Sequence, residues 1–411
     1  MKRHRMIPYV RAFLLALALL ACSPPRAHAQ GTGRSMDIDL SVRSAGMGGA
    51  SNALSWGDLN YWGNPALLGY TTGVRYLHTH TQLVPELSND VFLNSNVVQV
   101  GGGGVGIVFS GQPFDAGGVR LNYGLSQGID ENGNPTGTGN SWETVKSFGA
   151  GVSLARSIES AIRLGGGPDL HLSRYADVSA GMNWKDVMIV LAPASVGGVG
   201  STSARDEGIH ARVTPIDGFH SETVVPIRVD LAYGYSVLSY NDDAMVTFIN
   251  ADQASPVTRF HRRGGAAQIV AGRLPVPPRD AAGTLHRALI EGLAPLIAVS
   301  VADDHIEYGG GSLVNGRTVG SGYEITLANI YTYRRGSYED PLSQIDGDTW
   351  GWGVGLPVGS FGGVRYDDAH WPRAMNSGLG MVHRSQWTAW LDPIEVWRGF
   401  GRRHRGAEHS I

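Results

Sequence analysis

The stretch that decides the fold class is Ile227-Arg-Val-Asp-Leu-Ala-Tyr-Gly-Tyr-Ser-Val237. Every second side chain in it is apolar, and the side chains between them are polar or small; the apolar set is Ile227, Val229, Leu231, Tyr233, Tyr235 and Val237. Successive side chains of a strand point to opposite faces. The period of two therefore predicts a β-strand with one apolar face and one polar face.

The same alternation recurs along most of the chain. It is clear in Val119–Tyr123, Phe148–Leu154 and Trp350–Leu356, and the further candidates are Gly73–Thr81, Val97–Ser110, Val257–Ala271, Ala294–Val301, Ile325–Tyr333, Gly362–Tyr366 and Gly378–Trp390. In Val97–Ser110 the apolar phase shifts across Gly101–Gly104, which predicts a bulge or kink. Segments of about nine to eleven residues match tilted membrane strands better than typical soluble ones.

Composition is consistent with this pattern. The chain has 58 glycines, 10 tryptophans and 15 tyrosines, but only 17% of its residues are charged. A soluble domain averages about a quarter charged residues. Few charges with abundant glycine and aromatics fit a sheet whose outer face meets lipid. They also fit a secreted all-β protein, so composition alone leaves both classes open.

The N-terminus is typical of a secretory signal peptide. Four basic residues precede an apolar run over residues 12–21, and Ala27-His28-Ala29 is a good cleavage site. Leu19–Cys22 resembles a lipoprotein processing box, but we favour cleavage after Ala29, which leaves a mature chain without cysteine. Removing Lys2, Arg3, Arg5, Arg11 and Arg26 from the 33 basic residues leaves 28 against 36 acidic ones, a formal charge of −8. This balance indicates no nucleic-acid partner.

The connections predict one barrel domain. Gly128–Ser141 and Gly197–Thr223 are polar and are predicted to be long loops, as on one side of a membrane barrel. Arg279–Glu291 is predicted to contain a short helix. The predicted organisation is a signal peptide over residues 1–29, an N-terminal segment over 30–70, a β-barrel over 71–400 and a basic polar tail over 401–411.

The stretch Arg43–Tyr70 is different in kind. Gly46, Gly48 and Gly49 carry no side chain, so the backbone there can turn sharply and lie close to another surface. At the other end Asn64 can cap a helical turn, and Pro65 suits its first position. These choices predict a segment packed against something that encloses it.

This stretch resembles the N-terminal signature of PorV/PorQ-type outer-membrane β-barrels, which are related in fold to FadL-type fatty-acid transporters. The matching positions are Gly46, Met47, Gly48, Gly49, Ala50, Asp58, Tyr61, Trp62, Asn64, Pro65 and Ala66. A weaker echo of the last strands lies in 322–325, 333–338, 351–355 and 365–368. The resemblance implies an all-β transmembrane antiparallel barrel of roughly fourteen strands, with residues 30–70 folded into the lumen as a hatch.

The same resemblance implies a function and a location. It implies an outer-membrane protein that contacts lipid and transports hydrophobic small molecules, or a PorV-like component that accepts secreted proteins in type IX secretion. The residues expected to form the hatch and gate the lumen are Gly46, Met47, Gly48, Gly49, Asp58, Asn64, Pro65 and Ala66. Aromatic side chains within the predicted strands or at their ends, such as Trp350, Tyr331, Trp387 and Trp390, are typical of interface girdles.

Motifs for catalysis, cofactors or metals are weak. The stretch 101–106 is glycine-rich but lacks the helix and lysine of a phosphate loop. Residues 130–134 resemble a calcium loop with Pro135 where glycine is needed. His78 and His80 share a strand face without a third ligand, so we interpret them as polar lumen-facing residues. The pairs at 242–243, 303–304 and 367–368 are predicted to mark turns. The sequence therefore predicts neither an enzyme nor a cofactor or metal site.

An alternative from another class is a secreted or surface-attached β-rich structural or binding protein with no transport role. It would bury its aromatic residues in the core of a β-sandwich. The predicted strands are long for a sandwich, which favours the barrel.

Overall fold

A computed structural model describes residues 33–111, 118–129, 135–191, 198–220, 225–239, 245–248, 254–257, 259–274, 284–309, 317–341, 343–359, 361–373, 377 and 379–393. The predicted signal peptide, the calcium-like loop at 130–134, the aspartate pair at 242–243 and the tail at 401–411 lie outside these residues. Among the described helices, none has the length and apolar character needed to cross a membrane.

One antiparallel sheet contains all seventeen strands of the described residues. They are β1 (Gly73–Gln82), β2 (Val91–Gly102), β3 (Val105–Ser110), β4 (Val119–Ile129), β5 (Pro135–Ser153), β6 (Ala176–Val190), β7 (Val199–Asp217), β8 (Ile227–Leu238), β9 (Met245–Phe248), β10 (Ala254–Pro256), β11 (Arg259–Ala271), β12 (Ile297–Gly309), β13 (Arg317–Leu327), β14 (Tyr331–Asp340), β15 (Ile345–Val358), β16 (Gly362–Trp371) and β17 (Val382–Leu391). The first strand pairs with the last, from Val74 opposite Leu391 to Gln82 opposite His383, so the sheet closes on itself.

The ring has fourteen strand positions. β3 and β4 share one position, because both pair with β2 on one side and β5 on the other. β9 follows β8 along β7, and β10 pairs with β9 just before β11 begins, so these two short strands extend existing positions. The predicted closed barrel of about fourteen strands is confirmed, and the closed ring excludes a sandwich.

We call the end of the barrel where β1 begins the proximal end, and the other the distal end. The proximal end carries tight turns after β2 and β13 and the helices α3 (Leu154–Leu164), α4 (Leu172–Tyr175) and α5 (Thr284–Gly292). Helix α5 confirms the predicted helix within Arg279–Glu291. The short 3-10 helix η4 (Gly218–His220) lies at the same end, after β7.

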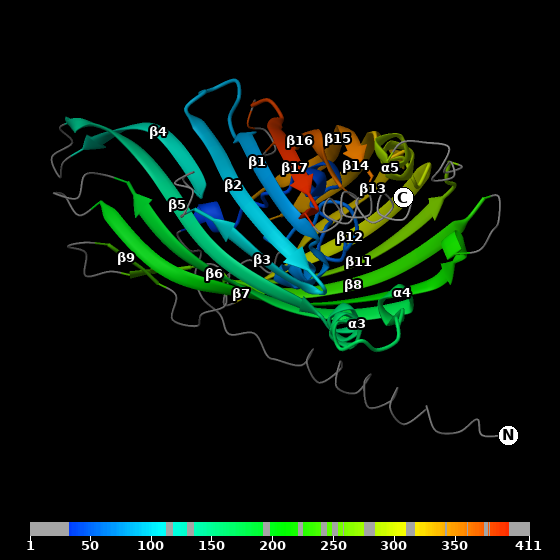
Figure 1. Ribbon diagram of the computed structural model, residues 1–411. Helices are drawn as coiled ribbons and strands as arrows, with labels where there is room; N and C mark the ends of the chain where they lie inside the picture. The colour runs from blue at the N-terminus through cyan, green and yellow to red at the C-terminus, as the bar shows by residue number, and fades with distance from the viewer. Residues whose placement is uncertain are drawn as a thin grey trace, which may run out of the picture.

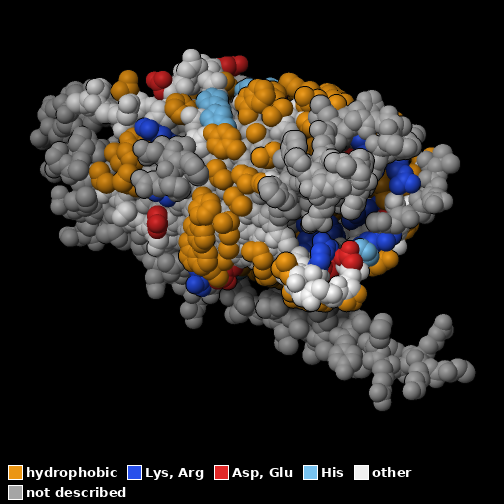
Figure 2. All heavy atoms as spheres, viewed as in Figure 1, with side chains coloured by type: hydrophobic (Ala, Val, Ile, Leu, Met, Phe, Trp, Pro, Cys, Tyr) orange, Lys and Arg blue, Asp and Glu red, His pale blue; other side chains and the backbone are white. Residues whose placement is uncertain are grey.

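The outer wall is largely apolar. On β8 the exposed set includes Ile227, Leu231 and Tyr233, whereas Asp230, Gly234 and Ser236 are buried on the lumen side. Figure 2 shows hydrophobic side chains spread over the viewed face. Tyr331, Trp350 and Trp387 are exposed on the outside as expected, but Trp390 faces the lumen and lines a cavity. An apolar outer wall on a closed barrel is the arrangement that lipid requires.

The N-terminal segment, residues 33–72, lies inside the barrel (Figure 1). It contains the 3-10 helices η1 (Arg34–Met36) and η2 (Pro65–Tyr70) and the short helix α2 (Val42–Gly46). As predicted, Asn64 caps η2: its side-chain oxygen accepts a hydrogen bond from the Ala66 amide at 3.0 Å. The predicted hatch is therefore present, and we use that name for residues 33–72.

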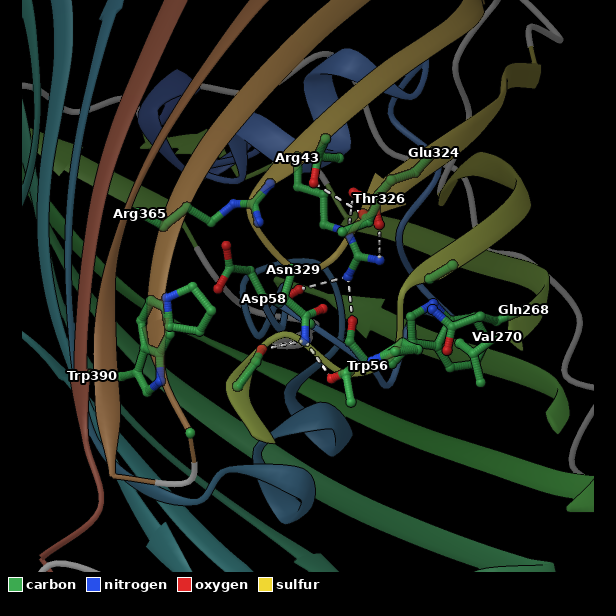
Figure 3. A pocket seen from close by; sticks show the side chains of 18 of the residues that line it. Arg43, Trp56, Asp58, Gln268, Val270, Glu324, Thr326, Asn329, Arg365 and Trp390 are labelled. Carbon is green, nitrogen blue, oxygen red and sulfur yellow. Dashed lines mark hydrogen bonds and ion pairs between the residues drawn. The ribbon is translucent and has the colours of Figure 1, made fainter. Parts of the chain in front are cut away.

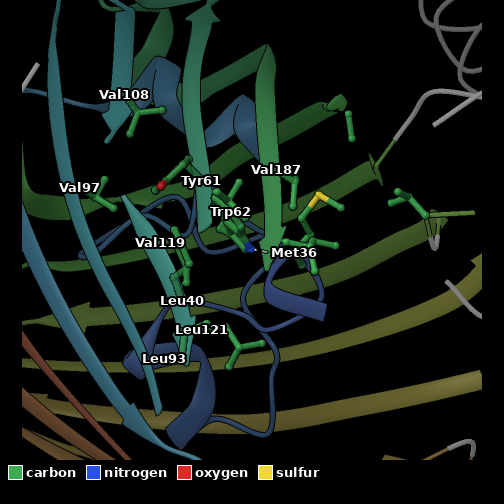
Figure 4. Packing of buried hydrophobic residues seen from close by; sticks show 14 of the residues in the cluster. Met36, Leu40, Tyr61, Trp62, Leu93, Val97, Val108, Val119, Leu121 and Val187 are labelled. Carbon is green, nitrogen blue, oxygen red and sulfur yellow. Dashed lines mark hydrogen bonds between the residues drawn. The ribbon is translucent and has the colours of Figure 1, made fainter. Parts of the chain in front are cut away.

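The lumen wall is not uniformly polar. Around the part of the hatch formed by Met36, Leu40, Tyr61 and Trp62, the strands β2 to β7 present apolar side chains, among them Leu93, Val97, Val108, Val119, Leu121, Val145, Val187 and Ile189 (Figure 4). Buried polar side chains interrupt this surface: Lys185 lies 3.7 Å from the Trp62 ring and pairs with Asp206 at 2.7 Å, and Glu143 accepts a hydrogen bond from the Ser35 amide of the hatch at 2.9 Å. One side of the lumen is thus a packed hydrophobic core between hatch and wall.

Several predicted boundaries are wrong. The phase shift at Gly101–Gly104 is a hairpin turn between β2 and β3, made by Gly103 and Gly104 at φ +62° and +90°. Ile325–Tyr333 likewise spans a turn. The predicted loops at Gly128–Ser141 and Gly197–Thr223 are mostly strand, because β5 and β7 each run for 19 residues. Polar composition misled here, since the polar side chains line the lumen or extend the strands beyond the apolar band.

Inward-facing glycines let the hatch backbone touch the wall. Gly101, Gly106, Gly151, Gly181 and Gly208 form one continuous row of cross-strand partners over β2, β3, β5, β6 and β7. A Cβ atom at Gly181 would lie 2.2 Å from the Pro65 carbonyl oxygen, and one at Gly106 would lie 2.0 Å from that of Leu68. On the far side, Gly320 and Gly336 meet Gly48 in the same way. No larger residue fits at these positions.

Replacing Gly181 by alanine should loosen the hatch, because the new methyl group meets backbone atoms that cannot move separately. The expected cost is about 1–3 kcal/mol in the free energy of unfolding, together with faster proteolysis of residues 33–72. Gly265→Ala is the matched control, since nothing lies within 4 Å of a Cβ there. Equal stability and equal proteolysis of the two variants would contradict the close packing.

Candidate functional site

Two buried ion clusters fix the hatch to the wall. In the first, Arg43 of α2 binds Glu324 of β13 through two nitrogens, at 3.0 and 2.8 Å. Arg334 of β14 contacts Glu324 and Asp367, each at 2.7 Å, and Arg365 completes the chain at 2.8 Å from Asp367. Buried charges are tolerated only when they are paired and hydrogen-bonded. Arg43 therefore makes the hatch a part of the wall's own charge network.

The second cluster centres on Asp304 of β12. One of its carboxylate oxygens accepts the backbone amides of Ser51 and Asn52, at 2.8 and 2.9 Å, and two nitrogens of Arg262 of β11. Arg262 also donates to the Gly49 carbonyl and lies 3.3 Å from Asp39. A single wall arginine thus bridges two points of the hatch, Gly49 and Asp39, to one wall carboxylate.

A third anchor lies near the proximal end at Tyr70. Its hydroxyl donates to Nδ1 of His210 at 3.1 Å, and Nε2 of the same ring donates to the Ala53 carbonyl at 3.0 Å. Burial, and then the nearby carboxylate of Asp177, raise the pKa of Tyr70 to about 12. The hydroxyl therefore stays protonated at neutral pH and keeps its role as donor.

The hatch lies between two cavities. The proximal cavity, of about 520 Å³, is lined by polar and charged groups that include Arg43, Asp58, Gln268, Glu324, Asn329 and Arg365, with Trp56 and Trp390 (Figure 3). Asp58 is 3.6 Å from Arg75 of β1 across this space. The proximal cavity is thus a polar, charged chamber.

The distal cavity, of about 440 Å³, has a different lining. Its walls are mostly aromatic and aliphatic, with Trp62, Leu238, Phe260, Ile306, Tyr308 and Trp371 among them. Arg262, Arg384 and Asp39 supply polar groups at its hatch side. Pockets of several hundred Å³ with mostly apolar walls and a few fixed polar groups are typical of small-molecule sites.

The predicted gating residues are brought together in the hatch, but they do different things. Met47, Pro65 and Ala66 are buried against the wall, and Gly48 donates its amide to Thr349 at 2.8 Å. The side-chain amide of Asn64 donates a hydrogen bond to the Asn52 carbonyl at 3.0 Å. Two of the eight line a cavity: Asp58 faces the proximal one and Gly49 the distal one. Most of the set anchors the hatch, and its gating role stays a prediction.

Sequence reasoning missed the wall charges that hold the hatch. Asp304 and Asp367, which the sequence predicts to mark turns, lie inside β12 and β16 and face the lumen. Arg262, Glu324 and Arg334 occupy inward positions of strands whose side chains alternate between apolar and small or polar. A single charged residue on the small-residue face of such a strand could have indicated these sites. A charge that faces the lumen needs a partner, and the hatch can supply one.

His78 and His80 do not face the lumen as we predicted. Arg75 lines the proximal cavity, and Thr79 lies on the same inner face of β1, so the two histidines are on the outer face. Their Nδ1 atoms lie 2.9 Å from Asn96 Oδ1 and 2.6 Å from Asn94 Oδ1 respectively. The calcium-like loop cannot be placed, because it lies outside the described residues.

The closed ring, the apolar outer wall and the anchored lumen segment define a transmembrane β-barrel with an N-terminal hatch. No protein family model and no curated protein sequence matches the chain. Among solved structures, it is similar to the toluene transporter TbuX of Ralstonia pickettii, with 13% identity over 85% of this chain and 96% of that one and a TM-score of 0.37.

Two further similar structures are the toluene transporter TodX of Pseudomonas putida, with 10% identity over 89% of this chain and 98% of that one and a TM-score of 0.36, and a FadL homologue of Pseudomonas aeruginosa, with 10% identity over 90% and 99% and a TM-score of 0.37. Likenesses at this level carry no argument, and the fold assignment rests on the strand pairing above.

Arg334→Met should destabilise the protein strongly, because Glu324 and Asp367 would be left buried without a full set of partners. The expected loss in the free energy of unfolding is about 3–5 kcal/mol. Arg335→Met on the next residue is the control, since its pair with Asp348 is exposed. Denaturant unfolding of the detergent-solubilised protein measures both, and equal stabilities would show that the buried cluster does not stabilise the fold.

Proposed function

We propose that the protein admits apolar or amphipathic small molecules through the outer membrane, with the distal cavity as the entry site and the hatch as the barrier beneath it. The observation that carries this proposal is the lining of the distal cavity. Rings of Trp62, Phe260 and Trp371 surround a space in which each buried CH₂ group of a ligand gains about 0.8 kcal/mol. A solute with an apolar body suits this space.

The polar groups of the distal cavity favour a ligand with one hydrogen-bonding end. Arg384 and Arg262 lie at the hatch side, and their partners there are Asp39 and backbone carbonyls of the hatch. A carboxyl or hydroxyl group can exchange with those partners without leaving a buried charge unpaired. We therefore favour compounds with a small polar group over pure hydrocarbons.

We propose that passage involves local movement of the hatch rather than its expulsion. Expulsion would separate Arg43 from Glu324 and the Ser51 and Asn52 amides from Asp304. By contrast, the segment Trp56–Asp58 is partly exposed at the proximal cavity and is tied to Arg43 through two backbone carbonyls. Its movement would open a path while the buried anchors at Asp304 and Asn64 persist.

This function places the protein in the outer membrane, exported through cleavage after Ala29. A role in type IX secretion would use the distal rim as a docking surface for secreted proteins. The lumen cavity favours the transport of small molecules over that role, because a folded protein cannot enter a cavity of about 440 Å³.

Uptake into cells tests the proposal. Cells that express the protein should take up radiolabelled oleate and toluene several-fold faster than vector-only cells, whereas uptake of glycerol should change little. Ile306→Gln puts an amide on the wall of the distal cavity and should reduce the oleate gain by about tenfold, as one buried unsatisfied polar group costs about 1–3 kcal/mol.

Glu307→Gln, at the next and outward-facing position, is the matched control and should keep the full gain. No gain with either apolar compound would rule out the transport role. An equal gain with glycerol would show an open pore instead of a selective one.

Deleting residues Gly46–Gly69 should leave the barrel assembled, because every strand pairing that closes the ring lies outside this segment. The lumen charges Asp304 and Arg262 would then meet water, and single-channel conductance in planar bilayers should rise well above that of the intact protein. Heat-modifiable mobility on gels checks that the variant is folded. A folded deletion variant with unchanged conductance would show that the hatch is not the barrier.

A further inference from the structure

A group of metal-ligand side chains lies on the outer face of the last hairpin. Asp368 and His370 alternate on β16, and His370 is the direct cross-strand partner of His383 on β17. The three side chains share one face, because the residue between the first two, Ala369, is buried inside against Val42 and Ala45. Directly opposed residues of an antiparallel pair have Cβ atoms only about 5 Å apart.

Their ligand atoms converge. Nε2 of His383 is 2.6 Å from Oδ2 of Asp368, and Nδ1 of His370 is 3.5 Å from Oδ1 of the same carboxylate. All three candidate ligand atoms lie within 4.8 Å of one another. Ligands of a tetrahedral zinc ion, each about 2.1 Å from the metal, are about 3.4 Å apart, so small side-chain rotations suffice.

Neighbouring side chains hold these ligands in place. The Trp350 ring stacks on His370, with 4.0 Å between ring centroids and 8° between planes. The Tyr366 hydroxyl donates to Asp368 at 3.3 Å. Within the described part of the chain, the buried Nδ1 of His370 has no hydrogen-bond partner. A fixed ring with an unsatisfied nitrogen beside a carboxylate is what a metal ligand requires.

The group is within reach of aqueous ions. Arg335, Trp350, His370 and His383 form one cross-strand row around the outside of the barrel. Arg335 in that row makes an exposed ion pair with Asp348, so the row lies at the distal edge of the apolar band. His383 itself is 40% exposed.

We propose that Asp368, His370 and His383 bind one divalent transition-metal ion of the Zn²⁺ class. Two imidazoles and one carboxylate suit zinc, copper or nickel better than calcium or magnesium, which prefer oxygen ligands. These three side chains leave a fourth position that water would fill. The bound ion ties β16 to β17 beside the seam where β17 meets β1.

Titration of the detergent-solubilised full-length mature chain, without a polyhistidine tag, tests this site. Isothermal titration with Zn²⁺ should show one ion per chain, and Co²⁺ should give the intense visible absorption of tetrahedral coordination. His370→Ala and His383→Ala should each weaken binding by about a hundredfold, since each removes a direct ligand. Zinc should also raise the melting temperature of the intact protein and not that of the two variants.

His78→Ala and His80→Ala are the matched controls, because these outer-face histidines are not part of the group and should leave binding unchanged. Heat-modifiable mobility confirms that each variant is folded. If a substitution prevents folding, zinc X-ray absorption of the wild-type protein decides instead, with two imidazole nitrogens per zinc as the expected result. Absence of saturable binding, or equal binding by folded His370→Ala and His383→Ala variants, would overturn the proposal.

Discussion

The structure depends on direct contact between the hatch backbone and the inside of the barrel wall. Where side chains would normally separate two such surfaces, the wall has glycine, and Gly106, Gly181 and Gly320 let carbonyl groups of the hatch lie against the strands. The buried clusters around Asp304 and Glu324 then fix the orientation of the hatch against the wall through directional hydrogen bonds. Because an unpaired buried charge is costly, hatch and wall specify each other's position.

This contact divides the lumen unequally. The hatch fills one side against the apolar faces of β2 to β7 and leaves two cavities, a charged one at the proximal end and an aromatic one at the distal end. In the proposed direction of entry, a molecule from the distal end would meet an apolar surface first and a charged chamber after the hatch. That order is consistent with the proposed capture of an apolar solute and its release on the other side of the hatch.

Much of the fold could be predicted from the sequence, because alternation in stretches such as Ile227–Val237 reports directly which face meets lipid. Gly48, Asn64 and Pro65, whose conformations are local properties, predicted a segment packed against an enclosing surface, and the family resemblance implied that this segment is a hatch in the lumen. Its partners could not be predicted, because Arg262 and Asp304 approach Ser51 only after the ring closes. The prediction of strand limits failed where strands with polar residues extend beyond the apolar band, as in β5 and β7. The prediction that His78 faces the lumen failed. When both faces of a strand carry polar residues, the alternation does not indicate which face is inside.

The central claim is that the distal cavity above an anchored hatch receives an apolar ligand. Diffraction from crystals soaked in bromobenzene tests it most directly, because anomalous scattering locates the bromine independently of the rest of the density. The account predicts a bromine peak in the distal cavity, among Trp62, Phe260 and Trp371, with the hatch still in contact with Asp304. Bromine found only on the outer wall or in the proximal cavity would contradict it.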